Sequence, residues 1–243
     1  DVFLCANDKT IPQALRRLGD IFEETKTPFA VTFGNHDHDY DDIWPTEDQL
    51  AFYKQYENCI VPEDRFNPGT YNVPIMSSDG ETLKFNLWIF DSGDYDKDGH
   101  YGCVQPDQIE WYNNTRDAMT AENGGEVVPS IAFQHIIPQE PTQKIFVPSD
   151  VNMGDLTINF QDGTSHTFLP DFTKFENGYL FEKSCPSYGN DGQWDAMVNG
   201  GDVLGVVVGH DHVNNFIVDV DGVDLIMTPG CTYSSYYEGM IQG

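Results

Sequence analysis

The residues of this sequence best suited to do chemistry are its seven histidines, four of which share a position. His36, His135, His210 and His212 each lie within a few residues of the end of an apolar run that predicts a buried strand. Because ligand sites in α/β sheets gather beyond the carboxyl ends of strands, three separate strands are predicted to deliver imidazoles to one edge. A lone histidine in such a place is usually a hydrogen-bonded loop residue, but four are hard to explain in that way.

The spacing around two of these histidines is typical of a metal site. The segment Gly-His-Asp-His at 209–212 places two imidazoles in one turn, where they can reach two adjacent metals. Gly209 gives the backbone the freedom to approach an ion closely. This turn therefore offers His210 and His212 as candidate ligands.

A second segment, Gly-Asn-His-Asp at 34–37, offers a different set of groups. Asn35 supplies a neutral carbonyl oxygen as a ligand, and His36 supplies a proton donor beside it. Asp37 is placed to orient or polarise that histidine. Mixed His, Asn and Asp ligands favour Zn, Mn or Fe over Ca.

The elements that must position these residues alternate between strand and helix. We expect strands at 2–6, 29–33, 84–90, 128–133 and 203–208, helices at 12–25, 47–58 and 106–119, and a hairpin of 215–220 with 223–228 around Asp221-Gly222. Residues 139–190 carry few periodic signals. Without an internal repeat or a low-complexity linker, the sequence predicts one domain over 1–243, of mixed α/β architecture.

The charge balance excludes two classes of partner. The chain has 12 Lys and Arg against 40 Asp and Glu, a net charge of −28. Nucleic acid binding needs clustered basic residues, and an anionic membrane surface would repel this acidic protein. No apolar run approaches the ~20 residues of a membrane-spanning helix. A phosphorylated substrate is compatible with this charge only if bound cations reverse the local field.

The cysteines, an acidic run and the start of the sequence leave further questions open. The five cysteines are odd in number, widely spaced and form no Cys-x-x-Cys pair, and one disulfide pair is possible. The acidic run at 94–98 resembles the start of a calcium loop, but Gln105 stands where glutamate is required, so a solvated turn is expected. The sequence starts at Asp1 without Met, and we expect further residues before it and a short extension after 243. Localisation and oligomeric state stay open, with an extracytoplasmic or secreted protein favoured.

The chain resembles the calcineurin-like metallophosphoesterase family, which includes the purple acid phosphatases. The segments that carry the resemblance are FAVTFGNHD (29–37), FDSG (90–93), PDQIEW (106–111), IAFQHIIP (131–138) and VVVGHDHVNNF (206–216), and the likeness extends over about residues 1 to 243. The resemblance implies a four-layer α/β/β/α sandwich of mixed sheets with a dinuclear metal centre. The expected cofactors are two divalent or trivalent ions, Mn, Zn or Fe.

The resemblance also assigns ligands residue by residue. Asp8 stands where the family has a carboxylate that bridges both metals, although Asn7 replaces the usual glycine before it. One metal would then take Asp8, Asn35, His135 and His210, and the other would take Asp8 and His212. The family's Asp-x-His motif is absent and would precede Asp1. Ile11 stands in place of the tyrosine that gives purple acid phosphatases their charge-transfer centre, so no such centre is expected.

The implied function is an enzyme, a metallophosphoesterase that hydrolyses phosphoesters with a metal-activated hydroxide. His36 would stabilise the developing charge or protonate the leaving group, supported by Asp37. The substrate is a phosphorylated small molecule or another phosphoester, and monoester, diester and nucleotide stay open. Two alternatives also stay open: a catalytically impaired relative that binds metal as a binding module, favoured by Asn7 and the absent motif, and a mononuclear hydrolase.

Overall fold

The computed structural model describes residues 1–2, 10–148, 157–159, 165–189 and 192–231. Its helices are α1 (Ile11–Thr25), α2 (Thr46–Tyr53), α3 (Pro106–Glu122), α4 (Gln139–Ile145) and α5 (Gln193–Gly200), with a short 3-10 helix at Asn35–Asp37. Its strands are β1 (Tyr71–Met76), β2 (Leu83–Ile89), β3 (Ser130–Phe133), β4 (Phe146–Pro148), β5 (Thr157–Asn159), β6 (Ser165–Pro170), β7 (Phe175–Tyr179), β8 (Val203–Val208), β9 (Asn215–Val220) and β10 (Val223–Met227).

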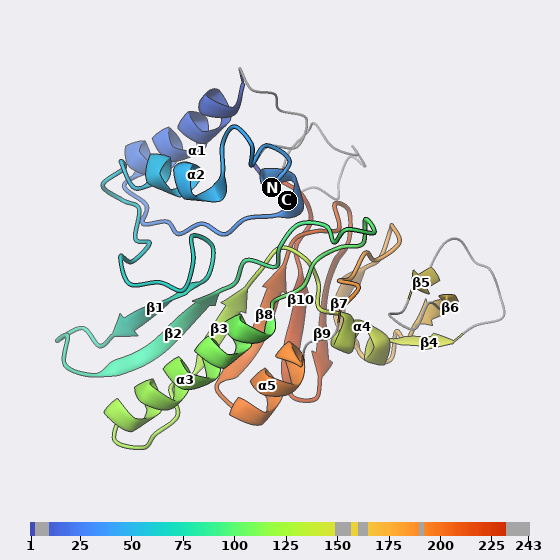
Figure 1. Ribbon diagram of the computed structural model, residues 1–243. Helices are drawn as coiled ribbons and strands as arrows, with labels where there is room; N and C mark the ends of the chain where they lie inside the picture. Colours follow the sequence, from blue (N-terminus) through green and yellow to red (C-terminus); the bar gives the residue numbers. More distant parts are fainter. Residues whose placement is uncertain (3–9, 149–156, 160–164, 190–191, 232–243) are drawn as a thin grey trace.

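A mixed seven-stranded sheet organises the described residues, in the order β1-β2-β3-β8-β10-β9-β7 (Figure 1). Its centre is parallel: β2 pairs with β3, β3 with β8, and β8 with β10. Its outer strands β1, β9 and β7 run antiparallel to their neighbours. A separate three-stranded sheet has the order β4-β6-β5. The α/β class with mixed sheets is therefore confirmed.

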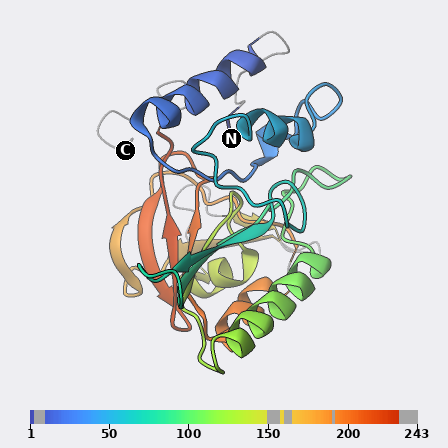
Figure 2. The same ribbon diagram turned by 90° about the vertical axis from the view of Figure 1, so that its left-hand side faces the viewer.

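Helices cover one face of the large sheet, and the main hydrophobic core lies between these helices and the sheet. Figure 1 shows α3 and α5 across this face, and α1 with α2 beyond the edge at which the central parallel strands end. Figure 2 shows the same separation from the side. The core cluster includes the fully buried Trp88, Tyr112, Trp194 and Val206. Burial of such large apolar side chains is the main favourable contribution to folding.

A buried carboxylate joins this core at the amino ends of the parallel strands. Asp202 Oδ2 accepts hydrogen bonds from Trp88 Nε1 at 2.9 Å and Ser130 Oγ at 2.8 Å. Its Oδ1 accepts one from the hydroxyl of Tyr112 at 2.5 Å. Burial and the neighbouring Asp202 carboxylate raise the pKa of Tyr112. One side chain at the start of β8 therefore satisfies donors from β2, β3 and α3.

A second, smaller unit carries the residues from 11 to 61. Ile11 and Leu15 of α1 pack with Phe29 and Tyr53 in one buried cluster. Phe33 and Leu50 pack with Tyr71 and Ile89, which joins this unit to the large sheet. The Gly34–Asp37 segment is thereby held over the sheet edge.

The strand expected at 29–33 is not formed. Phe29 makes only an isolated parallel bridge with Cys59. The backbone of Val31 instead exchanges hydrogen bonds with the hydroxyl of Tyr71, which donates to its carbonyl and accepts from its N–H. Phe29 and Phe33 at the ends of the run are buried, and the three residues between them are half-buried. The hydroxyl of Tyr71 takes the place of a neighbouring strand as hydrogen-bond partner of Val31.

Most other expected elements are confirmed, with changes at their ends. The helices expected at 12–25 and 106–119 correspond to α1 and α3, and the hairpin around Asp221-Gly222 is β9 with β10. Asp221 has a φ of 58° and Gly222 one of 85°, as a tight two-residue turn requires. The helix expected at 47–58 ends earlier, as α2. Residues 139–190 include α4 and several short strands, and the strand expected at 2–6 lies almost wholly outside the described residues.

Two further expectations concern membrane-spanning helices and disulfide bonds. In the described part of the chain, no helix is long and apolar enough to cross a membrane. Within the same residues Cys59, Cys103, Cys185 and Cys231 are free thiols, while Cys5 lies outside them.

Replacing Asp202 by alanine should strongly destabilise the fold. The change leaves the buried hydroxyls of Ser130 and Tyr112 without their acceptor, and it leaves Trp88 Nε1 with Ser130 Oγ alone. We expect the free energy of unfolding to fall by about 3 kcal/mol, because each buried unsatisfied donor costs ~1–3 kcal/mol. Urea unfolding measures the change, with Asp64→Ala as a control at an exposed loop carboxylate. Equal unfolding midpoints for the two variants would contradict the role given to Asp202.

Candidate metal centre

Three parallel strands bring their following residues to one edge of the sheet. Asp91 follows β2, His135 follows β3 and His210 follows β8. Both histidines are buried, with 8 % and 7 % of their surface exposed. The structure brings His135 and His210 together at this edge.

The two imidazoles are in direct contact. His210 Nδ1 lies 3.1 Å from His135 Nε2, and the ring planes are nearly perpendicular with centroids 5.0 Å apart. Burial lowers the pKa of His135 well below its usual 6.5. Burial, and then the proximity of His135, lowers the pKa of His210 to about 3. Both rings are therefore neutral near pH 7, the form in which an imidazole nitrogen binds a metal.

Asn35 presents a buried carbonyl oxygen to the same edge. It is fully buried in the 3-10 helix at 35–37, and its amide nitrogen donates to the hydroxyl of Tyr95 at 2.7 Å. Its Oδ1 is buried and has no hydrogen-bond partner among the described residues. A buried amide oxygen without a partner costs free energy unless a ligand binds it. Its donor type suits a metal ion, so the residue fits the role expected of it.

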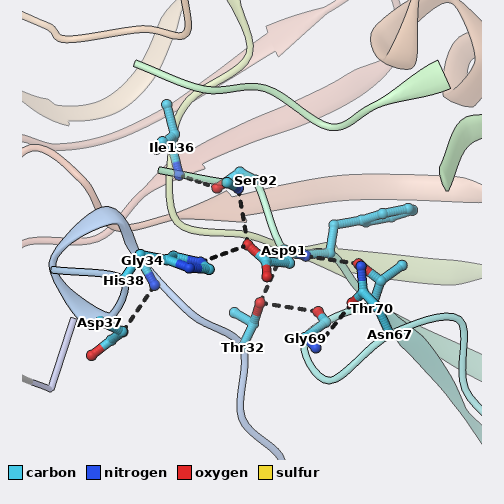
Figure 3. Close-up of polar contacts among 12 residues, drawn as sticks. Thr32, Gly34, Asp37, His38, Asn67, Gly69, Thr70, Asp91, Ser92 and Ile136 are labelled. Carbon is cyan, nitrogen blue, oxygen red and sulfur yellow. Dashed lines mark hydrogen bonds and ion pairs between the residues drawn. The ribbon is translucent and has the colours of Figure 1, made fainter. Parts of the chain in front are cut away.

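Asp37 builds the turn that holds Asn35, rather than orienting His36. Its Oδ2 accepts the N–H of Gly34 at 2.9 Å (Figure 3). Its Oδ1 accepts the N–H of Val2 at 2.6 Å. His36 pairs instead with Asp39, whose Oδ2 lies 2.7 Å from His36 Nδ1. The physical reason is the helical turn, which brings side chains three residues apart onto one face.

His36 lies at the surface of the site. Its side chain keeps 28 % of its surface exposed. With Nδ1 held by Asp39, Nε2 is the ring nitrogen left to meet a ligand. His36 is therefore accessible to solvent, whereas His135 and His210 are buried.

An anionic oxygen fits between the turn at 34–37 and His135, which follows β3. Asp1 Oδ2 lies 3.0 Å from His135 Nε2, and its Oδ1 accepts the backbone N–H of His36 at 3.0 Å. A Cβ at position 34 would lie 2.1 Å from this Oδ1 and 2.7 Å from the His135 ring, so only glycine fits there. This space thus accommodates an oxyanion between an imidazole and a backbone donor.

The other two expected ligands are His212 and Asp8. His212 is half-buried two residues beyond His210, and burial lowers its pKa. Between these two histidines, Asp211 is buried and anchors the turn, accepting from Asn214 Nδ2 at 2.8 Å and the N–H of Cys185 at 3.0 Å. Asp8 lies outside the described residues.

Sequence reasoning missed a charged pair beside this site. His38 Nε2 lies 3.5 Å from Asp91 Oδ1 (Figure 3). Its Nδ1 lies 3.0 Å from Asp41 Oδ2. Burial lowers the pKa of His38, but the hydrogen bonding and charge of Asp91, followed by those of Asp41, raise it overall to about 9. Asp91 follows a parallel strand as the histidines do, so the same strand-end argument, applied to carboxylates, would have found it.

Two tyrosines beside the ligands were also missed. Tyr95 holds the Asn35 amide, and the Tyr101 ring packs edge-on against His210 at a centroid distance of 4.3 Å. Both come from the loop after β2, whose sequence gives no periodic signal.

The ion pair of His38 and Asp91 should make stability depend on pH. The pKa of His38 is higher in the folded protein than its ordinary 6.5. The stabilisation is therefore fully present below about pH 6.5 and is lost as the pH rises through 9. A double-mutant cycle of His38→Gln and Asp91→Asn, measured by urea unfolding, should give a coupling on the order of 2 kcal/mol at pH 6 and near zero at pH 10. A coupling that is constant over this range would contradict the assignment.

Comparison with known proteins supplies relatives but no matching family model. Three Arabidopsis thaliana proteins are similar in sequence. Probable inactive purple acid phosphatase 14 is 27 % identical over 232 residues, which is 88 % of this chain and 52 % of that protein. Probable inactive purple acid phosphatases 29 and 28 are 23 % and 24 % identical, over 87 % and 86 % of this chain and 52 % and 51 % of their own lengths.

The chain therefore spans about half the length of the curated relatives that it matches. Among solved structures, a dimetal phosphatase from Danio rerio aligns with a TM-score of 0.43 at 11 % identity, over 89 % of this chain and 76 % of that one. By sequence, the chain is similar to proteins named as probable inactive purple acid phosphatases.

Proposed function

We propose that the protein is a metal-dependent hydrolase that cleaves phosphoesters at the edge formed by β3, β8 and the turn at 34–37. The observation that carries the proposal is the buried Asn35 Oδ1, which lacks a hydrogen-bond partner among the described residues, at a site where His135 and His210 are in contact. An amide oxygen and two neutral imidazoles form a donor set that suits Zn, Mn or Fe.

In this proposal, two ions share the site. Asn35, His135 and His210, with Asp8, would hold one ion, and His212 with Asp8 would hold the other. When bound, such ions lower the pKa of a coordinated water and bind phosphate oxygens. The number and identity of the ions belong to the proposal.

The chain's own residues would supply the remaining chemistry. His36 is exposed and has Nδ1 fixed by Asp39, so its Nε2 can give a proton to the leaving oxygen of the substrate. The backbone N–H of His36 and the imidazole of His135 flank the space that accommodates an oxyanion. Asp37 keeps the turn in the shape that presents both Asn35 and His36.

Charge gives further support for a cation in the site. The chain carries a net charge of −28, so a phosphate approaches it against a repulsive field. The protonated His38 offsets part of that field but pairs with Asp91 and Asp41. Bound cations would reverse the sign locally, where the substrate binds.

A second candidate function is metal-dependent binding without turnover. The names of all three Arabidopsis thaliana relatives include the word inactive. Asn7, in place of the usual glycine, points the same way. In this alternative the protein keeps the ligands and binds a phosphoester but does not hydrolyse it. A mononuclear hydrolase is a third possibility, and metal stoichiometry separates it from the others.

Two histidine variants should respond differently if the roles are assigned correctly. In the protein expressed from its complete coding sequence, His210→Ala should lose metal and activity together. His36→Ala should keep its metal and lose about 10²- to 10⁴-fold in kcat, the usual contribution of a general acid. Elemental analysis and hydrolysis of an unactivated phosphomonoester, after reconstitution with Mn, Zn and Fe, measure both.

Each variant serves as the matched control for the other, since both remove one imidazole from the same edge. Wild-type turnover in His36→Ala would contradict its role as the acid. Metal binding without hydrolysis in the wild-type protein would favour the binding module. Failure of every reconstituted form to retain metal would remove the proposal.

A further inference from the structure

A cavity of about 560 Å³ lies beside the candidate metal centre. Tyr95 and Tyr101 line it, and the same two residues contact Asn35 and His210. Its volume is within the range of small-molecule sites. A substrate whose phosphate reaches the metal ligands can therefore place the rest of its structure in this cavity.

The walls of the cavity are rich in tyrosine. The rings of Tyr95 and Tyr101 have centroids 5.4 Å apart, tilted by 35°. Tyr188 is held beside them, since its N–H donates to the carbonyl of Tyr101, and its ring stacks on His100 at 3.8 Å. Aromatic faces carry a negative electrostatic potential and attract cations, including ammonium groups.

The formal charges in the lining are negative. Asp91, Asp94 and Asp96 line the cavity, and its described lining includes neither Lys nor Arg. His38 pairs with Asp91, and His100 pairs with Asp96 at 2.9 Å. Asp94 differs, because its Oδ1 is buried and has no hydrogen-bond partner within the described chain. Burial raises the pKa of Asp94, which marks an anion short of solvation.

We infer that this cavity binds an ammonium group on the leaving portion of the substrate, so that the preferred substrates are phosphoesters of amino alcohols. Asp94 supplies the counter-charge, and Tyr95, Tyr101 and Tyr188 supply the aromatic faces. Leaving groups that carry further phosphates or carboxylates are repelled by the same wall. The inference rests on the proposed function for the reaction itself. There, a water molecule loses a proton and its oxygen bonds to phosphorus. The bond from phosphorus to the alcohol oxygen breaks, and that oxygen takes a proton from His36, so no net proton is gained or lost.

The binding test compares choline with 3,3-dimethyl-1-butanol, an uncharged molecule of the same shape. Isothermal titration calorimetry of the complete protein in 150 mM NaCl should show choline binding at least about tenfold more tightly. Asp94→Asn should remove most of that advantage. Asp98→Asn is the matched control. Asp98 is an exposed carboxylate of the same loop, four residues after Asp94, and it pairs with Lys97 at 2.8 Å. It should leave choline affinity unchanged.

Equal affinity for choline and its neutral counterpart would overturn the inference, and so would an unchanged affinity in Asp94→Asn. Hydrolysis separates this result from the proposed function. The metal-loaded protein should hydrolyse p-nitrophenyl phosphate, and its kcat/KM should favour phosphocholine over glycerol 2-phosphate. Hydrolysis without that preference refutes the inference alone. Choline binding at Asp94 in a protein that hydrolyses nothing refutes the proposed function and supports the cation pocket.

Discussion

The parallel pairing of β2, β3 and β8 is the constraint on which the candidate site depends. Its register aligns Trp88, Ala132 and Val206 in one row across the sheet. Asp91, His135 and His210 follow these residues by three, three and four positions. At about 3.3 Å per residue, the three side chains must emerge at nearly the same height. A slip of one residue would turn every side chain of the strand to the other face and separate the two histidines.

The second half of the site comes from a distant part of the chain and needs its own support. Asn35 and His36 lie on a short turn that no strand of the large sheet extends into. The Asp37 carboxylate closes this turn on itself through Gly34. Packing of Phe33 against Tyr71 and Ile89 then fixes the turn relative to the sheet. Asn35 and Tyr95 meet across this junction, so the side chain of Asn35 is held in place only when both units are present.

The sequence could predict what depends on local periodicity and on strand ends. The helices, the hairpin at Asp221-Gly222 and the meeting of His135 with His210 follow from such signals. The partner of His36 did not follow, because adjacency in sequence suggested Asp37 whereas the turn brings Asp39 alongside. The run at 29–33 signalled burial but could not reveal that a tyrosine hydroxyl would satisfy its backbone. Tyr95 and Tyr101 act through an irregular loop, where side-chain positions depend on tertiary contacts alone. The place of Asp8 stays a prediction.

The position of Asp202 has a consequence for how this sequence can evolve. Asp202 and Ser130 stand at the beginnings of β8 and β3, whereas the histidines follow the ends of the same strands. The hydrogen bond between Asp202 and Ser130 is thus separated from the candidate metal site by the length of β3 and β8. Selection can then relax on one edge without acting on the other. Substitutions at the histidine edge would therefore leave the hydrogen bonds of Asp202 in place, and the fold would keep this source of stability whatever the other edge binds.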